Sequence, residues 1–253
     1  MKNCLVIFYS FFYRLFIGLP SIIIGFFKDR ALLLKSPTDI VIRDIKDYGI
    51  HIFQKPLKED EIKILLNDFK ELKKTNLIGQ HGQLKGRIYQ EGILTPLLGK
   101  YVKKIKPYIV EFLDTEKVNV EISYYQESVP CNDLTEIPGG EFHVDDNRAN
   151  LKYFIYLTDV EEKNGPFCCI PATGTWRLKR SLMRGIMWEL TNYRKYLYEF
   201  LINYESFEKG EKLILGKKGT HFLVDTTTLH RAKPVVQGVR KVAVISFNRA
   251  SLI

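Results

Sequence analysis

Residues 142–160 read FHVDDNRANLKYFIYLTDV and join a His-x-Asp pair to an apolar segment that predicts a strand. His143 and Asp145 are two positions apart, so an extended backbone points both side chains to one face. A second histidine, His230, ends the distant segment Thr226-Thr227-Thr228-Leu229-His230. Two imidazoles and one carboxylate form the facial triad that leaves open positions on non-haem Fe(II). We therefore interpret His143, Asp145 and His230 as catalytic metal ligands.

Other residues that could bind a metal fit the same site less well. Asp146 is the nearest, but a strand turns it to the opposite face. His221 and Asp225 have a second metal-like spacing, yet four strand positions separate them by roughly 13 Å, too far for one ion. We therefore expect Asp225 to orient a turn or a ligand histidine. A His-x-Asp pair also occurs by chance, and the alternative for His143 is a solvated loop histidine.

Arg240 comes ten positions after His230 and begins the apolar run Arg240-Lys241-Val242-Ala243-Val244-Ile245. Its guanidinium is suited to hold the far carboxylate of a metal-bound oxo-acid through two parallel hydrogen bonds. The alternative is an arginine on the surface of a strand.

The ordered set of motifs resembles the phytanoyl-CoA dioxygenase-like branch of the Fe(II)/2-oxoglutarate-dependent oxygenases. An opening strand and helix at 48–69 and the region from about 120 to 250 carry this resemblance, which covers roughly four-fifths of the chain. The similar segments are residues 142–146, 151–160, 164–167, 170–174 and 225–234, continuing to Arg240.

This resemblance implies a dioxygenase that uses Fe(II), 2-oxoglutarate as co-substrate and dioxygen, and that releases succinate and CO2. His143, Asp145 and His230 would hold the iron and Arg240 the oxo-acid. Related halogenases place Gly or Ala at the position of Asp145, so a carboxylate there predicts hydroxylation or desaturation. The expected substrate is a small or lipid-linked organic molecule.

The chain departs from the family pattern at two places. Many relatives carry Ser or Thr where this chain has Ala232, and a Gly-Ser-His sequence where it reads Ala172-Thr173-Gly174-Thr175. Tyr153 and Ile155 share one face of their strand and are candidates to line the oxo-acid pocket, with core packing as the alternative. Lys152 points the opposite way and is expected to be a solvent lysine.

The periodicity predicts an α+β fold with a mainly β core. Many short strands with Gly and Pro turns favour a jelly roll, here a double-stranded β-helix or cupin-like barrel with flanking helices. We expect one oxygenase domain at 36–253 with a helical insertion at about 176–209, and a loop at 75–92. The predicted helices span 39–46, 58–74 and 97–114, and the predicted strands 49–53, 118–125, 152–157, 168–170, 221–225 and 241–247.

Residues 1–35 form an apolar N-terminal segment that is expected to be helical. The stretch 4–27 is long enough to span a bilayer. Arg14 would lie near its middle, and Pro20 would interrupt a helix there. A narrow polar stripe along the helix favours an anchor lying in a membrane interface. Packing against the barrel and a true transmembrane span are the alternatives.

Composition limits the function classes. The chain has 253 residues and four cysteines without a disulfide framework, which indicates reduced thiols and a cytoplasmic protein, peripherally membrane-associated if its N-terminus binds lipid. A net charge of +9 favours anionic partners, but no basic stripe with stacking aromatics indicates nucleic acid. The alternative function is a non-catalytic, membrane-associated binding protein on the same fold. The oligomeric state is not predicted.

Overall fold

A computed structural model describes residues 39–74, 87–91, 95–130, 140, 142–145, 150–174 and 210–249. The N-terminal segment 1–35, the insertion near 176–209 and Asp146 lie outside these described residues, so the predictions made for them stay predictions. Within the described ranges, no helix has both the length and the apolar character that crossing a membrane requires.

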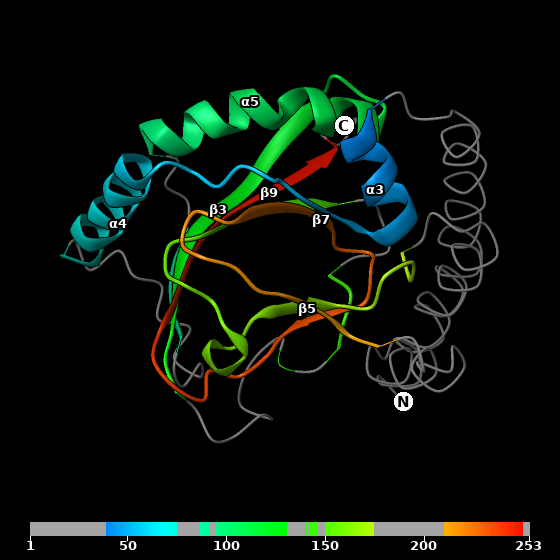
Figure 1. Cartoon of the computed structure of the whole chain (residues 1–253). Coiled ribbons are helices and arrows are strands. Elements are labelled where there is room, and N and C mark those ends of the chain that lie inside the picture. The colour runs from blue at the N-terminus through cyan, green and yellow to red at the C-terminus, as the bar shows by residue number, and fades with distance from the viewer. Residues whose placement is uncertain are drawn as a thin grey trace, which may run out of the picture.

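The strands form two antiparallel sheets in separate layers (Figure 1). The larger sheet has six strands in the order β1 (Ile50–Ile52), β7 (His221–Asp225), β4 (Leu151–Tyr156), β9 (Arg240–Arg249), β3 (Val118–Ser128) and β2 (Arg87–Glu91). The smaller sheet has the order β6 (Lys212–Ile214), β5 (Phe167–Cys169) and β8 (His230–Ala232).

Three helices lie on one side of the six-stranded sheet, away from the smaller sheet (Figure 1). They are α3 (Ile40–Tyr48), α4 (Glu59–Lys74) and α5 (Pro96–Leu113). Helix α3 begins where the Asp39 carboxylate accepts a hydrogen bond from the Val41 amide at 2.7 Å. It ends at Gly49, whose φ of 82° suits glycine, and the chain then turns directly into β1.

The two faces of the six-stranded sheet have different partners because side chains alternate along each strand. On the outer face, Tyr153 and Ile155 of β4 belong to a core cluster with buried residues of all three helices. On the inner face, Phe154 and Tyr156 pack in a second cluster with Phe167 and other residues of the smaller sheet. The terms outer face and inner face are used below in this sense.

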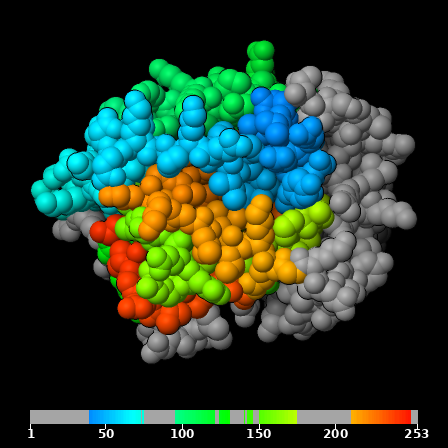
Figure 2. Space-filling model, in the orientation of Figure 1, coloured from blue at the N-terminus to red at the C-terminus, as the bar shows by residue number. Residues whose placement is uncertain are grey.

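Loop connections bring distant segments together on the surface. The Leu57 amide donates to the Gly219 carbonyl at 2.9 Å, and Val160 and Gly216 form an isolated β-bridge. Figure 2 shows the result as the orange atoms of residues near 215 between the cyan atoms of residues near 55 and the yellow-green atoms of residues near 160. The chain therefore closes one side of the two-layer structure with contacts between residues far apart in sequence.

The predicted elements agree with the observed ones where the periodicity is strong. All three predicted helices and the strand at 221–225 are confirmed, with helix boundaries that differ by two residues at most. The loop predicted at 75–92 is wrong in part, since 87–91 form β2. The three-residue strands β6 and β8 were not predicted, whereas the equally short β1 and β5 overlap the predicted strands 49–53 and 168–170.

Candidate metal centre

The two histidines of the proposed triad are paired through their backbones. The amide of His143 donates to the carbonyl of His230 at 2.9 Å, and the amide of His230 donates back at 3.0 Å. Two residues further on, the Asp145 amide donates to the Thr226 carbonyl at 3.2 Å. These bonds attach the 142–145 segment to the edge of β8. His143 is therefore part of a β-bridge, and its side chain is 26% exposed.

The three side chains converge. One potential ligand atom from each of His143, Asp145 and His230 can be chosen so that all three lie within 4.8 Å of one another. Oδ1 of Asp145 is 3.6 Å from Nε2 of His143 and 3.7 Å from Nε2 of His230. Two imidazoles and one carboxylate around a common point are a donor set suited to a divalent transition metal. Residues from two segments far apart in sequence thus form one candidate metal site.

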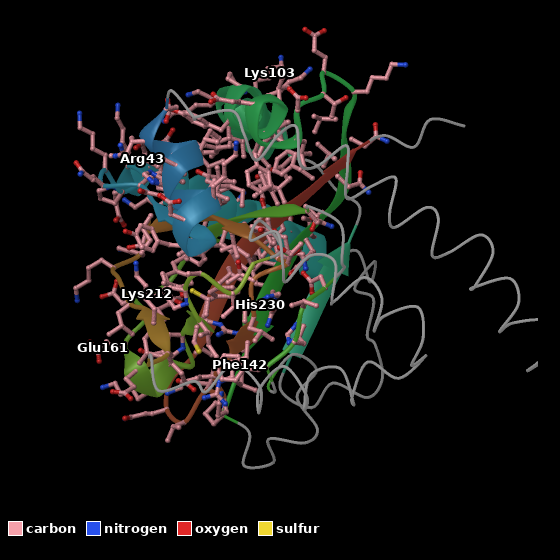
Figure 3. All side chains as sticks on the ribbon, turned by 90° about the vertical axis from the view of Figure 1, so that its right-hand side faces the viewer. Arg43, Lys103, Phe142, Glu161, Lys212 and His230 are labelled. Carbon is pink, nitrogen blue, oxygen red and sulfur yellow. The ribbon has the colours of Figure 1, made fainter. Side chains whose placement is uncertain are left out.

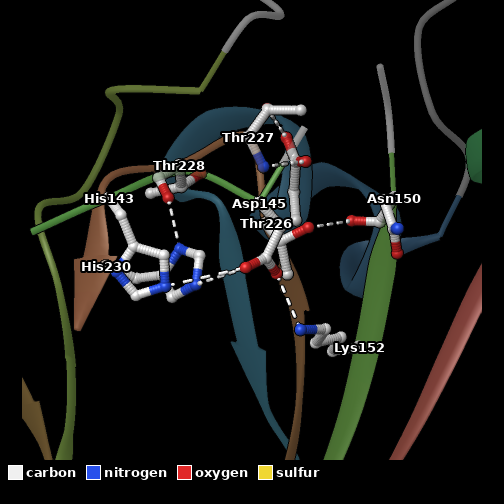
Figure 4. A network of polar contacts seen from close by, with 9 residues as sticks. His143, Asp145, Asn150, Lys152, Thr226, Thr227, Thr228 and His230 are labelled. Atoms are coloured by element: carbon white, nitrogen blue, oxygen red, sulfur yellow. Dashed lines mark hydrogen bonds and ion pairs between the residues drawn. The ribbon is translucent and has the colours of Figure 1, made fainter. Parts of the chain in front are cut away.

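The His230 ring is oriented by its surroundings. Its Nδ1 lies 2.8 Å from the Thr228 carbonyl oxygen, which can only accept, so Nδ1 carries the proton and Nε2 faces Asp145 with its lone pair (Figure 4). Phe167 stacks on the ring at 5.4 Å between centroids. In Figure 3, His230 and Phe142 lie far below α5, the helix that carries Lys103. A ligand histidine with a fixed tautomer is what a metal site requires.

Asp145 is held in its charged form. Burial by itself raises the pKa of this carboxyl, but the neighbouring His230 and the ammonium of Lys152 outweigh it and keep the pKa below its usual range. Nζ of Lys152 is 2.8 Å from Oδ2 of Asp145 (Figure 4). Asp145 is therefore ready to bind a metal ion without losing a proton. The prediction that Lys152 is a solvent lysine is wrong, because its side chain is only 21% exposed.

A turn between β7 and β8 supports the site. The buried Asp225 accepts hydrogen bonds from the amide and the hydroxyl of Thr227, at 3.0 and 2.7 Å. Thr173 donates its hydroxyl hydrogen to the Ile170 carbonyl and accepts from the Leu229 amide at 2.9 Å. Asp225 thus orients a turn, as expected from the sequence. Thr173, in the segment that departs from the family pattern, holds the residue before His230.

His221 does not belong to a metal site. It lies on the outer face, stacked on Phe53 at 4.6 Å and hydrogen-bonded to Tyr153 Oη at 2.8 Å. Its Nε2 donates to the Lys55 carbonyl oxygen at 2.9 Å. Both ring nitrogens are therefore used within the core.

Tyr153 and Ile155 are placed away from the triad. Both are in the outer-face cluster with the helices, whereas Lys152 is on the face that meets Asp145. The prediction that they line an oxo-acid pocket beside the metal is corrected, and core packing describes them. The period-2 pattern grouped the residues of β4 correctly, but it could not tell which group faces the site.

Arg240 is buried at 3% exposure and lies on the inner face with Val242 and Val244. It donates hydrogen bonds to the Gly165 carbonyl and, at 3.3 Å, to the Ser128 hydroxyl. The alternative of a surface strand arginine is thereby excluded. Ser128 also accepts a hydrogen bond from the Gln126 amide at 2.8 Å. The hydrogen bonds of Gln126 and Ser128 near Arg240 were not predicted from the sequence. Polar residues at two inward positions of β3 were the signal that could have indicated them.

The chain was compared with known proteins. No protein-family profile matches it, and no curated protein matches it. Solved structures do. HygX from Streptomyces hygroscopicus, with nickel and 2-oxoglutarate bound, has a TM-score of 0.58 and 9% identity, over 85% of this chain and 88% of HygX.

Two further structures have the same likeness. The epimerase SnoN, in complex with Fe3+, alpha ketoglutarate and nogalamycin RO, has a TM-score of 0.61 and 11% identity over 83% of this chain and 82% of SnoN. EctD from S. alaskensis in its apoform has a TM-score of 0.58 and 15% identity, over 85% of this chain and 80% of EctD. At this level of identity the comparison establishes a shared fold: helices packed on antiparallel sheets, as in 2-oxoglutarate-dependent non-haem iron enzymes.

Proposed function

We propose that this protein is an Fe(II)- and 2-oxoglutarate-dependent dioxygenase that hydroxylates a small organic substrate. The observation that carries the proposal is the convergence of His143, Asp145 and His230 within 4.8 Å. Similar folds crystallised with nickel or Fe3+ and with 2-oxoglutarate support it. The order of motifs supports placement in the phytanoyl-CoA dioxygenase-like branch.

The strand order supports a double-stranded β-helix as the finer description of the fold. From β4 onward the chain passes repeatedly between the two layers. Strands β4, β7 and β9 lie in the larger sheet, and β5, β6 and β8 lie in the smaller one. The 142–145 segment adds a bridge at the free edge of β8. In such a barrel the two layers close around a site at one end, and residues 36–253 would form one domain.

Three residues would hold the iron, and one would hold the co-substrate. Nε2 of His230, a nitrogen of His143 and Oδ1 of Asp145 lie close together and face the same point. Bound iron, with 2-oxoglutarate and dioxygen, supplies the oxidising chemistry and releases succinate and CO2. Arg240 would bind the far carboxylate of 2-oxoglutarate through charge-assisted hydrogen bonds.

Ser128 compensates for Ala232 in this proposal. The resemblance expects a hydroxyl at position 232, close to the oxo-acid carboxylate, and Ala232 has none. The Ser128 hydroxyl lies 3.3 Å from Nη2 of Arg240 and is buried. A hydroxyl beside the guanidinium can donate to the same carboxylate from the opposite sheet.

Apolar side chains beside the triad would limit water. Val144, Ile170 and Leu229 form a small buried cluster, and Phe167 covers the His230 ring. Excluding water strengthens charge interactions in the site and protects a reactive centre from side reactions. These side chains therefore prepare the site for oxidation of a bound substrate.

For the reaction and the substrate, we propose a class and not a particular molecule. The carboxylate at position 145 supports hydroxylation over halogenation, since halogenases of related sequence lack it. HygX has been crystallised with hygromycin B bound and SnoN with nogalamycin RO, which supports a small organic molecule as substrate. A lipid-linked substrate depends on membrane contact by residues 1–35, which a vesicle-flotation assay of the full chain tests.

Anaerobic titration of the purified protein with Fe(II) and 2-oxoglutarate tests the proposal. We expect a saturable visible charge-transfer band that is absent from the Asp145→Ala and His230→Ala variants. Conversion of 2-oxoglutarate to succinate on admission of oxygen would follow. A folded wild-type protein that gives no band would overturn the proposal and favour the non-catalytic binding protein.

A further inference from the structure

Lys152 occupies an unusual position on the inner face. In β4 it shares that face with Phe154 and Tyr156, which are packed in the core between the sheets. Its neighbours in register are Val224 of β7 and Ser246 of β9. A lysine among apolar side chains needs a partner for its charge, because desolvating an unpaired ammonium is costly. Its charge is directed to Asp145.

The two oxygens of Asp145 have different partners. Oδ1 lies 3.6 and 3.7 Å from the two imidazole nitrogens, and Oδ2 lies 2.8 Å from Nζ of Lys152 (Figure 4). The ammonium therefore occupies the side of the carboxylate that faces away from the histidines. A carboxylate has two chemically equivalent oxygens, so this difference comes from its surroundings alone.

The backbone does not fix the carboxylate by itself. The Asp145 amide is bonded to the Thr226 carbonyl, which sets the position of the main chain. Rotation about the Cβ–Cγ bond would still exchange Oδ1 and Oδ2, or direct both toward a metal. Exchange gives an equivalent arrangement with Oδ1 at the ammonium. Directing both oxygens toward a metal would remove the 2.8 Å contact to Lys152, so the ammonium opposes that movement.

We propose that Lys152 is a positioning residue that restricts Asp145 to one metal-binding oxygen and so keeps all three remaining coordination positions available for 2-oxoglutarate and dioxygen. The proposal rests on the proposed function, because it concerns the same metal site. A triad that binds through three atoms leaves three adjacent positions open on a six-coordinate metal, two for the oxo-acid and one for dioxygen. A carboxylate that bound through both oxygens would take one of these three.

Replacing Lys152 should change the affinity for the metal and the affinity for 2-oxoglutarate in different ways. Replacing Lys152 removes a positive charge near the metal, which by itself favours binding of a cation. The freed carboxylate can then bind through both oxygens, which leaves 2-oxoglutarate one pair of coordination positions instead of three and so weakens its binding. A lysine with only a structural role would instead lower the affinity for both together.

The test uses Lys152→Met, Lys152→Arg and Lys152→Gln in the full chain. For Lys152→Met we expect unchanged or tighter binding of Co(II) and Fe(II), and roughly 10-fold weaker binding of 2-oxoglutarate to the iron-loaded protein, within the range seen when partners of metal ligands are changed. The d–d spectrum of the Co(II)-loaded variant should also change. Lys152→Arg should restore both the spectrum and the 2-oxoglutarate affinity.

Lys241→Met is the matched control. Lys241 makes an ion pair with Glu127 at 3.3 Å and is 31% exposed, one position along β9 from the inward-facing Arg240 and so on the outward side. Its removal should leave metal and 2-oxoglutarate binding unchanged. If Lys152→Met does not fold, Lys152→Gln carries the test, because it removes the charge that holds Oδ2 while keeping a polar side chain, and it should weaken 2-oxoglutarate binding in the same direction.

The outcomes separate the two proposals. No metal-dependent band in the wild type overturns the proposed function. A normal wild-type band with unchanged 2-oxoglutarate affinity in folded Lys152→Met and Lys152→Gln variants overturns the role of Lys152 alone. Equal loss of metal and co-substrate affinity in those variants also overturns it, since that result indicates a structural ion pair.

Discussion

The inner and outer faces of the six-stranded sheet use the same kinds of residue for different purposes. On the outer face, polar groups satisfy one another inside an apolar core, as in the 2.8 Å bond between Tyr153 and His221. On the inner face, Lys152 places its charge against Asp145, and Arg240 is buried with hydrogen bonds to Gly165 and Ser128. Neighbouring residues of one strand therefore have different surroundings according to which layer covers them.

His221 on the outer face and His230 in the candidate metal site differ in a similar way. His221 accepts a hydrogen bond at one ring nitrogen and donates one at the other, both within the protein. His230 donates from Nδ1 to a backbone carbonyl and directs Nε2 toward Asp145. The difference indicates that a ligand histidine is recognised by how its second nitrogen is used, and not by burial, since both are 5% exposed.

The largest effect should come from removing the Asp145 carboxylate, which should lower the affinity for the metal. Asp145→Ala should weaken Co(II) or Fe(II) binding more than about 100-fold, since even partners of metal ligands contribute 10–100-fold. Asp44 forms a 2.8 Å pair with His51 between α3 and β1 and is the matched control. Asp44→Ala should leave metal affinity unchanged in the same titration. Equal losses of metal affinity in Asp145→Ala and Asp44→Ala would show that Asp145 has no special role in metal binding.

The outer-face histidine should respond to pH through stability. Burial lowers the pKa of His221 from 6.5 to about 4. The unfolded chain binds a proton near pH 6.5 and the folded protein does not, so stability falls as the pH drops from 6.5 to 4, by about 3 kcal/mol in total.

Urea denaturation at pH 7 and pH 4.5 measures this change. His221→Gln has no group that titrates there, and it should lose less stability than the wild type over the same interval. Comparing the two proteins removes the contributions of other groups. Parallel curves would show that His221 is not the source of the pH dependence.

Arg240 tests the chemistry of the inner face. Arg240→Met should weaken 2-oxoglutarate binding by about 2 kcal/mol, roughly 30-fold, because charge-assisted hydrogen bonds contribute 1.5–3 kcal/mol. Iron affinity should change little. Calorimetric titration with each ligand measures both quantities, with Arg240→Lys as a variant that keeps the charge. Equal losses of iron and 2-oxoglutarate affinity would assign the arginine a structural role.

The smallest effect is expected at Tyr153. Tyr153→Phe removes one hydrogen bond to His221 and should lower the free energy of unfolding by about 1 kcal/mol. The charge-transfer titration should be unchanged, because Tyr153 faces the helices. A weaker affinity for 2-oxoglutarate in this variant would return Tyr153 to the site and contradict the division between the faces.

Much of the fold could be predicted from local patterns. The helices at 40–48, 59–74 and 96–113 follow from a 3.6-residue period, and the strand at 221–225 from its apolar run between turn signals. The elements β2, β6 and β8 could not be found in this way. They are three to five residues long and exist through pairing with strands distant in sequence.

The candidate site was predicted in part. His143, Asp145, His230 and Arg240 could be chosen from their residue types and order, and the structure brings the first three together and buries the fourth. The surroundings predicted for Lys152 and Tyr153 were wrong, since Lys152 contacts Asp145 and Tyr153 packs with the helices. A strand pattern divides side chains into two groups, but both groups of β4 contain large apolar side chains, so hydropathy does not identify the face that meets the smaller sheet.

The sequence by itself determined the donor set, the helices and the alternation of each long strand, because these depend on residue type and on spacing along the chain. The tertiary structure decided which face of the large sheet the helices cover, which partner each histidine nitrogen has, and where the charge of Lys152 is directed. Those features depend on contacts between segments far apart in sequence, and such contacts form only when the two layers pack together.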